Sequence, residues 1–422
     1  MRTGAGTQRR RVWPLLLAAA LAASPFAGAA SPTIEQFSYM KSLKEAEARA
    51  EVPAVFAQLE VMEPARRAAF ATERRDLFER VRTMRSLSGD ATGAARASAW
   101  IDIGDRMPAA YATQSGEALA AATPEDAIEA IVREARKRRI VILNEAHHVP
   151  QGRVFAGKLA RELRKIGYSY LAAEAFANDI PRHPKAVSRF MGFYVMEPMY
   201  AGFVRSAMQD GWSFVGYDHV ADSAVQREIG AARNIVENIF ARDPQARVFM
   251  YVGYGHASKQ QVARKDGWKS VATLLREQLG TDPLTVDQVV MQGRGDARVD
   301  HPQYRAAVER FAPSKPIVLK AAAGGHVTVG LRPRSHDMQV VHPDETMQGP
   351  HGRPLWMERQ AGLRPHPVPA GLLPASGRRL IQAFHVADGE GAVPADMVMV
   401  EAGKREPSLM LPEGQFRFAY EE

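Results

Sequence analysis

Residues 140–152 read IVILNEAHHVPQG, an apolar run that breaks abruptly into a carboxylate and two imidazoles. A short, continuously apolar run is typical of a strand that is covered on both faces of a parallel sheet. Glu145, His147 and His148 would then follow the carboxyl end of that strand, where open α/β sheets form their binding crevices. The stretch therefore predicts both the fold class and the position of a site.

Helical and extended patterns alternate around this stretch. The sequence TPED at residues 123–126 predicts a helix start with Thr123 as the hydroxyl cap, and the amphipathic helix then ends in cations before residue 140. Further helices are predicted at residues 154–167, 223–242 and 267–280, and further strands at residues 168–176, 212–218, 246–255 and 283–291. This alternation predicts an α/β fold, with a mainly parallel central sheet flanked by helices.

Composition and hydrophobic pattern divide the chain into four parts. Residues 1–30 are a predicted signal peptide, residues 31–120 a polar helical N-terminal segment, and residues 121–342 the α/β domain. Residues 343–422 are rich in proline and glycine and contain only short apolar runs, so we expect a small β-rich C-terminal extension there.

The first thirty residues have the pattern of a secretory signal. Three arginines at positions 9–11 precede a short apolar run, and small residues follow at positions 27–29. The alternatives are an uncleaved anchor helix, for which the run is short of the roughly 20 residues that a bilayer requires, and twin-arginine export. We expect an exported protein, periplasmic or secreted, with no stable membrane span.

Composition restricts the partners. Residues 1–30 contain four arginines and no acid, so their removal changes the formal charge from +8 to (55 − 4) − 47 = +4. This modest charge, without a basic block interleaved with aromatic residues, argues against nucleic acid as a partner. The chain has no cysteine, which excludes disulfides, thiolate metal sites and a lipid-modified cysteine. The expected partner is a small-molecule or peptide substrate.

Other predicted strands also end in polar chemistry. Glu174 lies in YLAAEAF, His256 follows VGYG, and Asp218 and His219 follow FVGY. Taken singly, each has a simpler explanation, because a carboxylate in a strand is often a paired core residue and a histidine at a strand end is often a surface residue. The coincidence of four such residues at strand ends favours a site, made of Glu145, His147, Glu174 and His256.

The alternation of side chains along a strand distinguishes the two adjacent histidines. Glu145 and His147 lie on one side of an extended backbone and His148 on the other. His147 is therefore expected to face Glu174 and His256, unless the chain turns early toward Gly152, in which case His148 could enter the site.

These motifs resemble those of the superfamily that joins erythromycin esterases, ChaN-type haem-uptake proteins and Tiki proteases. NEAHHVP resembles its G-E-x-H-x-x-P motif, AAEAF its second glutamate, VGYGHAS its second G-x-x-H motif, and REIGAARN at residues 227–234 its R-D-x-x-M-A-x-N helix. The resemblance covers about residues 124–295, with Asn144 in place of a glycine and Ala231 in place of a methionine. The spacing of His147, with Pro150 after it, is closest to ChaN-like proteins, whereas His148 fits the esterase branch.

The residues and the resemblance together leave three functions open. The first is hydrolysis of an ester or amide by Glu145, His147, Glu174 and His256, whose mixed donors suit Mn²⁺, Co²⁺ or Zn²⁺. A metal-free variant would use a histidine as general base. The second function is haem or iron binding for uptake. The third is a catalytically inactive periplasmic binding protein, which the departure at Asn144 favours. Secondary site residues are His148, Asp218, Arg227, Asn234 and Tyr254, with Arg227 or Tyr254 as candidates to stabilise an oxyanion.

Overall fold

A computed structural model describes most of the chain. The ranges it describes are residues 37–63, 66, 69–70, 73–102, 116–259, 266–295, 297, 300–330, 333–389 and 391–422. The predicted secretory signal at residues 1–30 lies outside these ranges.

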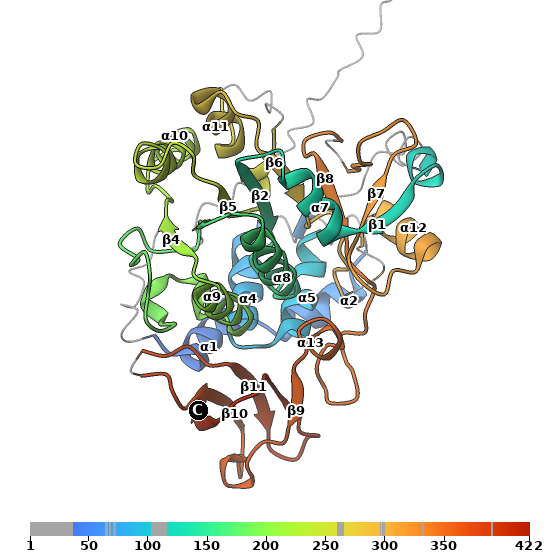
Figure 1. Cartoon of the computed structure of the whole chain (residues 1–422). Coiled ribbons are helices and arrows are strands. Elements are labelled where there is room, and N and C mark those ends of the chain that lie inside the picture. The colour runs from blue at the N-terminus through green and yellow to red at the C-terminus, as the bar shows by residue number, and fades with distance from the viewer. Residues whose placement is uncertain are drawn as a thin grey trace, which may run out of the picture.

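The described residues form an eight-stranded sheet in the order β1-β7-β8-β6-β2-β5-β3-β4 (Figure 1). The six strands from β8 to β4 pair in parallel, whereas β7 pairs antiparallel with β8 and with β1. This confirms the predicted α/β class with a mainly parallel sheet. The strands are β1 (Thr123–Asp126), β2 (Ile140–Glu145), β3 (Tyr170–Ala173), β4 (Ser213–Gly216), β5 (Val248–Gly253), β6 (Leu284–Asp287), β7 (Ile317–Lys320) and β8 (Met338–Val341).

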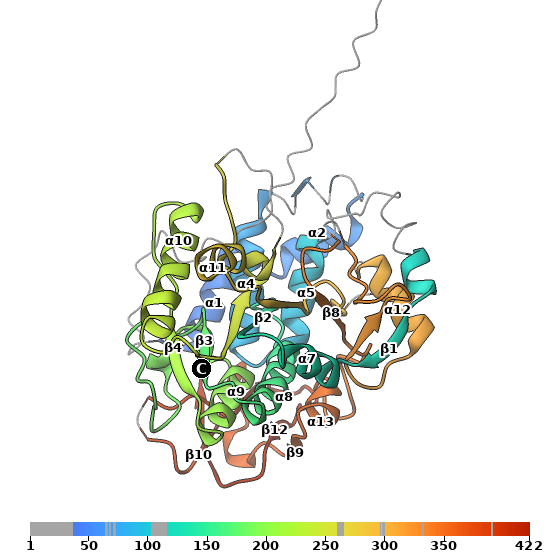
Figure 2. The ribbon, with the colours of Figure 1, turned by 45° about the horizontal axis from the view of Figure 1, so that its top comes forward.

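Helices cover both faces of the sheet, which explains why all six residues of β2 are buried. Val141 and Leu143 pack in the core beneath α7 (Ala127–Ala135), α8 (Gln151–Lys165) and α9 (Pro198–Gln209). Ile140 and Ile142 pack on the opposite face with α10 (Ala224–Ile235) and α11 (Val271–Leu279). In Figure 2, α8 and α9 lie below the strands and α10 and α11 above them.

One predicted element is wrong. Residues Thr123–Asp126 form β1 rather than the first turn of a helix, and they pair with β7 from Thr123↔Lys320 to Asp126↔Ile317. The helix begins at Ala127, and the Asp126 side chain accepts the cap hydrogen bond from the Glu129 N–H. A cap residue is therefore present, but residues 123–126 before the helix pair with the edge of β7 and join the sheet.

The N-terminal helices lie between the sheet and the C-terminal strands (Figure 1). Their apolar faces share one core with Leu380 and Met397 of the C-terminal region, and the Ser38 hydroxyl donates to Glu421 at 2.6 Å. Arg353 forms a buried ion pair with Asp396 at 2.9 Å. These N-terminal helices are α1 (Tyr39–Arg49), α2 (Ala54–Val61), α4 (Arg75–Leu87) and α5 (Ala91–Asp102).

The C-terminal extension is β-rich, as predicted. β10 (Arg378–His385) pairs antiparallel with β11 (Asp396–Glu401) and β13 (Phe416–Glu421), and β9 (Arg364–His366) pairs with β12 (Leu409–Leu411). Two further helices are α12 (Pro302–Phe311), between β6 and β7, and α13 (Trp356–Arg359), before β9. Among the described helices, none is long and apolar enough to cross a membrane.

Candidate functional site

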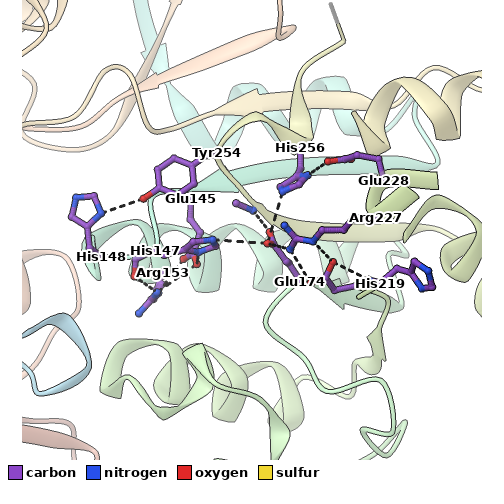
Figure 3. A network of polar contacts seen from close by, with 12 residues as sticks. Glu145, His147, His148, Arg153, Glu174, His219, Arg227, Glu228, Tyr254 and His256 are labelled. Carbon is purple, nitrogen blue, oxygen red and sulfur yellow. Dashed lines mark hydrogen bonds and ion pairs between the residues drawn. The ribbon is translucent and has the colours of Figure 1, made fainter. Parts of the chain in front are cut away.

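Three neighbouring parallel strands deliver the predicted site residues to one edge of the sheet (Figure 3). Glu145 is the last residue of β2, and Glu174 directly follows β3. β5 lies between them and ends at Gly253, after which the short helix η5 (Tyr254–Ala257) carries His256. The structure therefore brings together Glu145, His147, Glu174 and His256, which we call the carboxylate–histidine cluster.

The first half of the cluster is a buried pair of Glu145 and His147. Oε1 of Glu145 lies 2.8 Å from Nδ1 of His147, and Oε2 accepts from Nε of Arg153 at 3.0 Å. Burial alone would raise the pKa of Glu145, but Arg153 and His147 outweigh it and lower the pKa to about 2. Because an ionised carboxylate can only accept, Nδ1 carries the hydrogen, and Nε2 faces away from Glu145.

Arg153 fixes this pair from within the core. Its side chain is fully buried on α8, and besides Glu145 it donates to Glu197 at 2.8 Å and to the His147 carbonyl at 2.7 Å. Glu197 in turn caps the start of α9 through the Tyr200 N–H. A guanidinium shared between two carboxylates and a carbonyl holds the loop that carries His147 in one position.

The second half of the cluster is a pair of Glu228 and His256. Nδ1 of His256 forms a close ion pair with Oε1 of Glu228, and Oε2 of Glu228 accepts from the Val271 N–H at 2.6 Å. Burial would lower the pKa of His256, but the carboxylates of Glu174 and Glu228 outweigh it and raise the pKa to about 9. His256 is therefore an imidazolium at neutral pH.

Glu174 lies between the two pairs. Its Oε1 is 3.9 Å from Nε2 of His147 and 3.8 Å from Nε2 of His256, and it accepts from Arg227 at 2.7 Å. Burial would raise the pKa of Glu174, but His256, His147 and Arg227 lower it to about 2. Both imidazoles are too far from Glu174 for a direct hydrogen bond, so each Nε2 keeps room for another polar atom.

Gly253 allows this close approach. Its N–H donates to Oε2 of Glu174 at 2.6 Å. A Cβ atom at this position would lie 2.6 Å from Nε2 of His147 and 2.9 Å from Oε2 of Glu174. The backbone here has φ −80°, which any residue adopts, so lack of space is what requires a glycine.

Tyr254 separates the two adjacent histidines. The His147 ring stacks on Tyr194 with centroids 4.2 Å apart and meets the Tyr254 ring edge-on at 5.2 Å. His148 lies on the other side, with Nδ1 3.3 Å from the Tyr254 hydroxyl. The structure thus places His147, and not His148, beside Glu174. The expected extended backbone is absent, however, because β2 ends at Glu145 and both histidines lie in the turn that follows, where the Val149 N–H donates to the Ala146 carbonyl at 2.9 Å.

The remaining predicted residues lie around the cluster. Asp218 accepts from Arg227 at 2.9 and 2.8 Å, and Asn234 donates to the Tyr217 carbonyl at 3.0 Å at the end of β4. Asn144 replaces the expected glycine, and its amide donates to Asp287 at 2.7 Å and accepts from the Gln288 N–H at 2.8 Å. These bonds join the ends of β2 and β6.

Sequence reasoning missed Arg153, Glu197 and Glu228, which hold the cluster in place. One signal could have found Glu228. The buried face of α10 consists of Glu228, Gly230, Ala231, Ala232 and Ile235, so a carboxylate begins an otherwise apolar face. Buried carboxylates are uncommon unless they are paired, and His256 supplies the partner.

The contacts of the cluster do not suit a metal ion. In the described part of the chain, no group of three histidine, aspartate or glutamate side chains is arranged to hold one. Both oxygens of Glu145 are already bonded, and the Arg227 guanidinium occupies Oε1 of Glu174. The protonated His256 would also have to lose its proton to become a ligand. These contacts favour the metal-free version of the predicted site.

Comparisons with known proteins give only loose similarities. No family model matches the chain, and no curated protein sequence matches it. The type III effector HopBA1 is a similar solved structure, at 13% identity over 53% of this chain and 97% of that chain, with a TM-score of 0.33. Two structures described as bacterial protein toxins are similar at 18% and 12% identity, covering 51% and 61% of this chain and 46% and 68% of those chains, with TM-scores of 0.28 and 0.31. Overlaps this loose carry no argument about activity.

Proposed function

We propose that this chain is a hydrolase that cleaves an ester or amide bond by general acid–base catalysis, without a metal ion. One observation carries the proposal. Two imidazoles, each fixed through Nδ1 by a buried carboxylate, direct Nε2 toward the same oxygen of Glu174 from 3.9 and 3.8 Å. A carboxylate on Nδ1 sets the tautomer and orientation of a histidine, as in hydrolases that use histidine as a base.

His147 is the general base in this proposal. Its Nδ1 hydrogen is held by Glu145, so the lone pair on Nε2 can take a proton from a water molecule. The water oxygen then bonds to the carbonyl carbon of the substrate, and the carbonyl π electrons move to oxygen to give a tetrahedral oxyanion. Glu145, anchored by Arg153, stabilises the imidazolium that forms on His147.

His256 is the general acid. With a pKa of about 9, its Nε2 carries a proton at neutral pH. As the tetrahedral intermediate collapses, the bond to the leaving group breaks and His256 protonates the departing oxygen or nitrogen. The products are a carboxylic acid and an alcohol or amine. His147 then returns its proton to solvent and His256 recovers one, which restores the resting state.

Glu174 and Arg227 are positioning residues in this scheme. Arg227 donates to both Glu174 and Asp218, so we assign it to the placement of Glu174 rather than to an oxyanion. The side chains of His147 and Glu174 are each 10% exposed and that of His256 is 14% exposed, so the cluster is largely but not completely buried. Export of the protein is a further proposal, which rests on residues 1–30 alone.

The test is an initial-rate assay of the purified chain on chromogenic esters and amides, with EDTA present. We expect hydrolysis that persists in EDTA, and a loss of kcat/KM of about 10²–10⁴ in both His147→Asn and His256→Asn. His219→Asn is the matched control, since His219 lies at the same edge but outside the cluster, and it should keep the wild-type rate (Figure 3).

Two outcomes would contradict the proposal. Activity that EDTA abolishes and Mn²⁺, Co²⁺ or Zn²⁺ restores would replace the metal-free scheme with a metal-dependent one. If the wild-type protein hydrolysed every substrate only as fast as His147→Asn does, the hydrolase proposal would be excluded. A shifted Soret band on addition of haemin would then support haem binding, and an unshifted band would support an inactive binding protein.

A further inference from the structure

A cavity of about 230 Å³ lies on the far side of Tyr254 from the carboxylate–histidine cluster. Helices α4 and α5 form one wall, and the loops that follow β2 and β6 form the other. Tyr254 contacts both the cluster and the cavity. Its ring centroid lies 5.2 Å from that of His147, and its hydroxyl lies 3.3 Å from Nδ1 of His148, which lines the cavity. We call this space the basic cavity.

The charged residues that line the basic cavity are mainly cations. Among the residues that the structure describes, Arg75, Arg82 and Arg294 line it with one acid, Glu79, so their formal charge is 3 − 1 = +2. Arg75, Glu79 and Arg82 are spaced four and three residues apart on α4, which places them on one face of that helix. These three charged side chains of α4 therefore line the cavity together.

Arg82 is held in place at the inner wall. It is 8% exposed, and its guanidinium donates to Ser98 at 3.2 Å and to the Tyr254 hydroxyl at 3.4 Å, with Glu79 at 3.4 Å. Burial, followed by the positive charges of Arg82 and Arg294, holds the pKa of His148 well below its usual value. Arg75, Arg82 and Arg294 together give the cavity a positive potential, which favours an anion.

A buried amide donor adds a second, independent indication. Gln151 is 8% exposed and lines the cavity, and its Nε2 has no hydrogen-bond partner among the residues that the structure describes. Its Oε1 accepts from Gln292, which also lines the cavity, at 3.3 Å. Buried amide donors in proteins are nearly always bonded, so an acceptor from a ligand is the natural partner of Nε2.

We propose that the basic cavity binds an oxyanion, a carboxylate or a phosphate, that the substrate carries. The part of this inference that concerns the substrate rests on the proposed hydrolase. The volume of the basic cavity is below the roughly 300 Å³ at which pockets for drug-sized ligands begin, so the cavity suits one small charged group. The scissile bond and the anionic group of the substrate would then lie on opposite sides of the Tyr254 ring.

The first experiment measures anion binding without any catalysis. Thermal melts of the full chain are recorded against sodium phosphate and sodium acetate, with sodium chloride at equal ionic strength as the reference. We expect one of the two anions to raise Tm beyond chloride, and its dissociation constant to increase roughly 10- to 100-fold in Arg75→Gln and in Arg294→Gln. Arg74→Gln is the matched control, because it removes the same charge next to Arg75 but does not line the cavity.

The second experiment measures substrate preference. Wild type and Arg74→Gln should hydrolyse an ester that carries the bound anion faster than its uncharged analogue, and Arg75→Gln should reduce that preference roughly 10-fold or more. Two results of the thermal melts would overturn the anion site. One is that neither phosphate nor acetate raises Tm more than chloride does, and the other is that the rise in Tm persists in both Arg75→Gln and Arg294→Gln.

The two proposals fail separately. Hydrolysis of charged and uncharged esters at equal rates, without anion binding, would remove the anion site and leave the hydrolase. Anion binding that Arg75→Gln weakens, without hydrolysis of any ester, would leave the anion site and remove the hydrolase.

Discussion

The two glutamate–histidine pairs have nearly the same geometry but different surroundings. In each pair a buried carboxylate meets Nδ1, and Nε2 lies 3.9 or 3.8 Å from Oε1 of Glu174. Glu145 is also bonded to the buried Arg153, whereas Glu228 is bonded to a backbone N–H at the start of α11. A shared cation neutralises the carboxylate beside His147, while two carboxylates act on His256 and raise its pKa to about 9.

In the proposed hydrolase, the two pairs would serve opposite proton transfers. The proton affinity of an imidazole depends on the net charge of the groups around its carboxylate partner as well as on that partner. Pairs of titratable groups whose surroundings differ in this way are typical of acid–base catalysis.

The largest expected effect comes from the carboxylates. Glu145→Gln should lower kcat by about 10²–10⁴, because an amide can hold His147 in the wrong tautomer. Glu228→Gln should have a smaller effect, since Glu174 remains to favour the protonated His256. Single-turnover rates of both variants check this order, with circular dichroism to show that each is folded. Equal losses would mean that the pairs have equivalent roles.

The next effect concerns the cation that only one pair has. Arg153→Met should lower the free energy of unfolding by about 3–5 kcal/mol, because it leaves Glu145 and Glu197 buried without their common partner. Arg227→Met is the comparison, and it should cost less because the Arg227 side chain is 19% exposed and Asp218 is partly solvated. Urea denaturation measures both. A loss below about 1 kcal/mol for Arg153→Met would show that the anchor is not needed.

The third prediction separates the pairs by pH. The pKa of His256 in the folded protein is about 9, above its ordinary value of 6.5, so its protonation stabilises the fold fully below pH 6.5. That stabilisation, up to roughly 3 kcal/mol, is lost as the pH rises through 9. Urea midpoints between pH 6 and pH 9.5 should therefore fall more steeply for wild type than for His256→Asn. An identical slope in the two proteins would contradict the raised pKa.

The smallest effect concerns the space between the pairs. Gly253→Ala should cost about 1–3 kcal/mol of stability by overpacking, because the new methyl group meets His147 and Glu174. It should also lower kcat by displacing Nε2 of His147. Gly255→Ala is the control, since no atom lies within 4 Å of its Cβ position. Wild-type stability and rate in Gly253→Ala would show that the cluster tolerates expansion.

Much of the fold and of the site geometry was predictable because it depends on local patterns. The apolar run of β2 was sufficient to place Glu145 at the carboxyl end of a buried strand, whereas the position of His147 depends on the turn after Glu145, which the expected extended backbone did not include. The strand at Thr123–Asp126 was not predictable in this way, because it forms only where the distant edge of β7 is available. Its local sequence has the composition of a helix cap.

The partners of the cluster were harder to predict, since they are polar residues on otherwise apolar faces. The expected helix began at residue 154, whereas α8 begins at Gln151 and includes Arg153. Glu228 lies on the buried face of α10, but only the fold brings it to His256. A sequence pattern identifies which residues are candidates for chemistry, and contacts between distant elements determine their partners.

The hydrogen bond from Ser38 to Glu421 joins residues that are 383 positions apart, and this separation affects how the protein is made. The ribosome completes α1 and α4 first, but Leu380 and Met397, which pack on the same apolar core, emerge near the end of synthesis. Contacts between such distant residues form late, and exposed apolar surface promotes aggregation while they are missing. A nascent chain that stalls before β10 therefore leaves these helices, including the α4 wall of the basic cavity, without the strands that cover their apolar face.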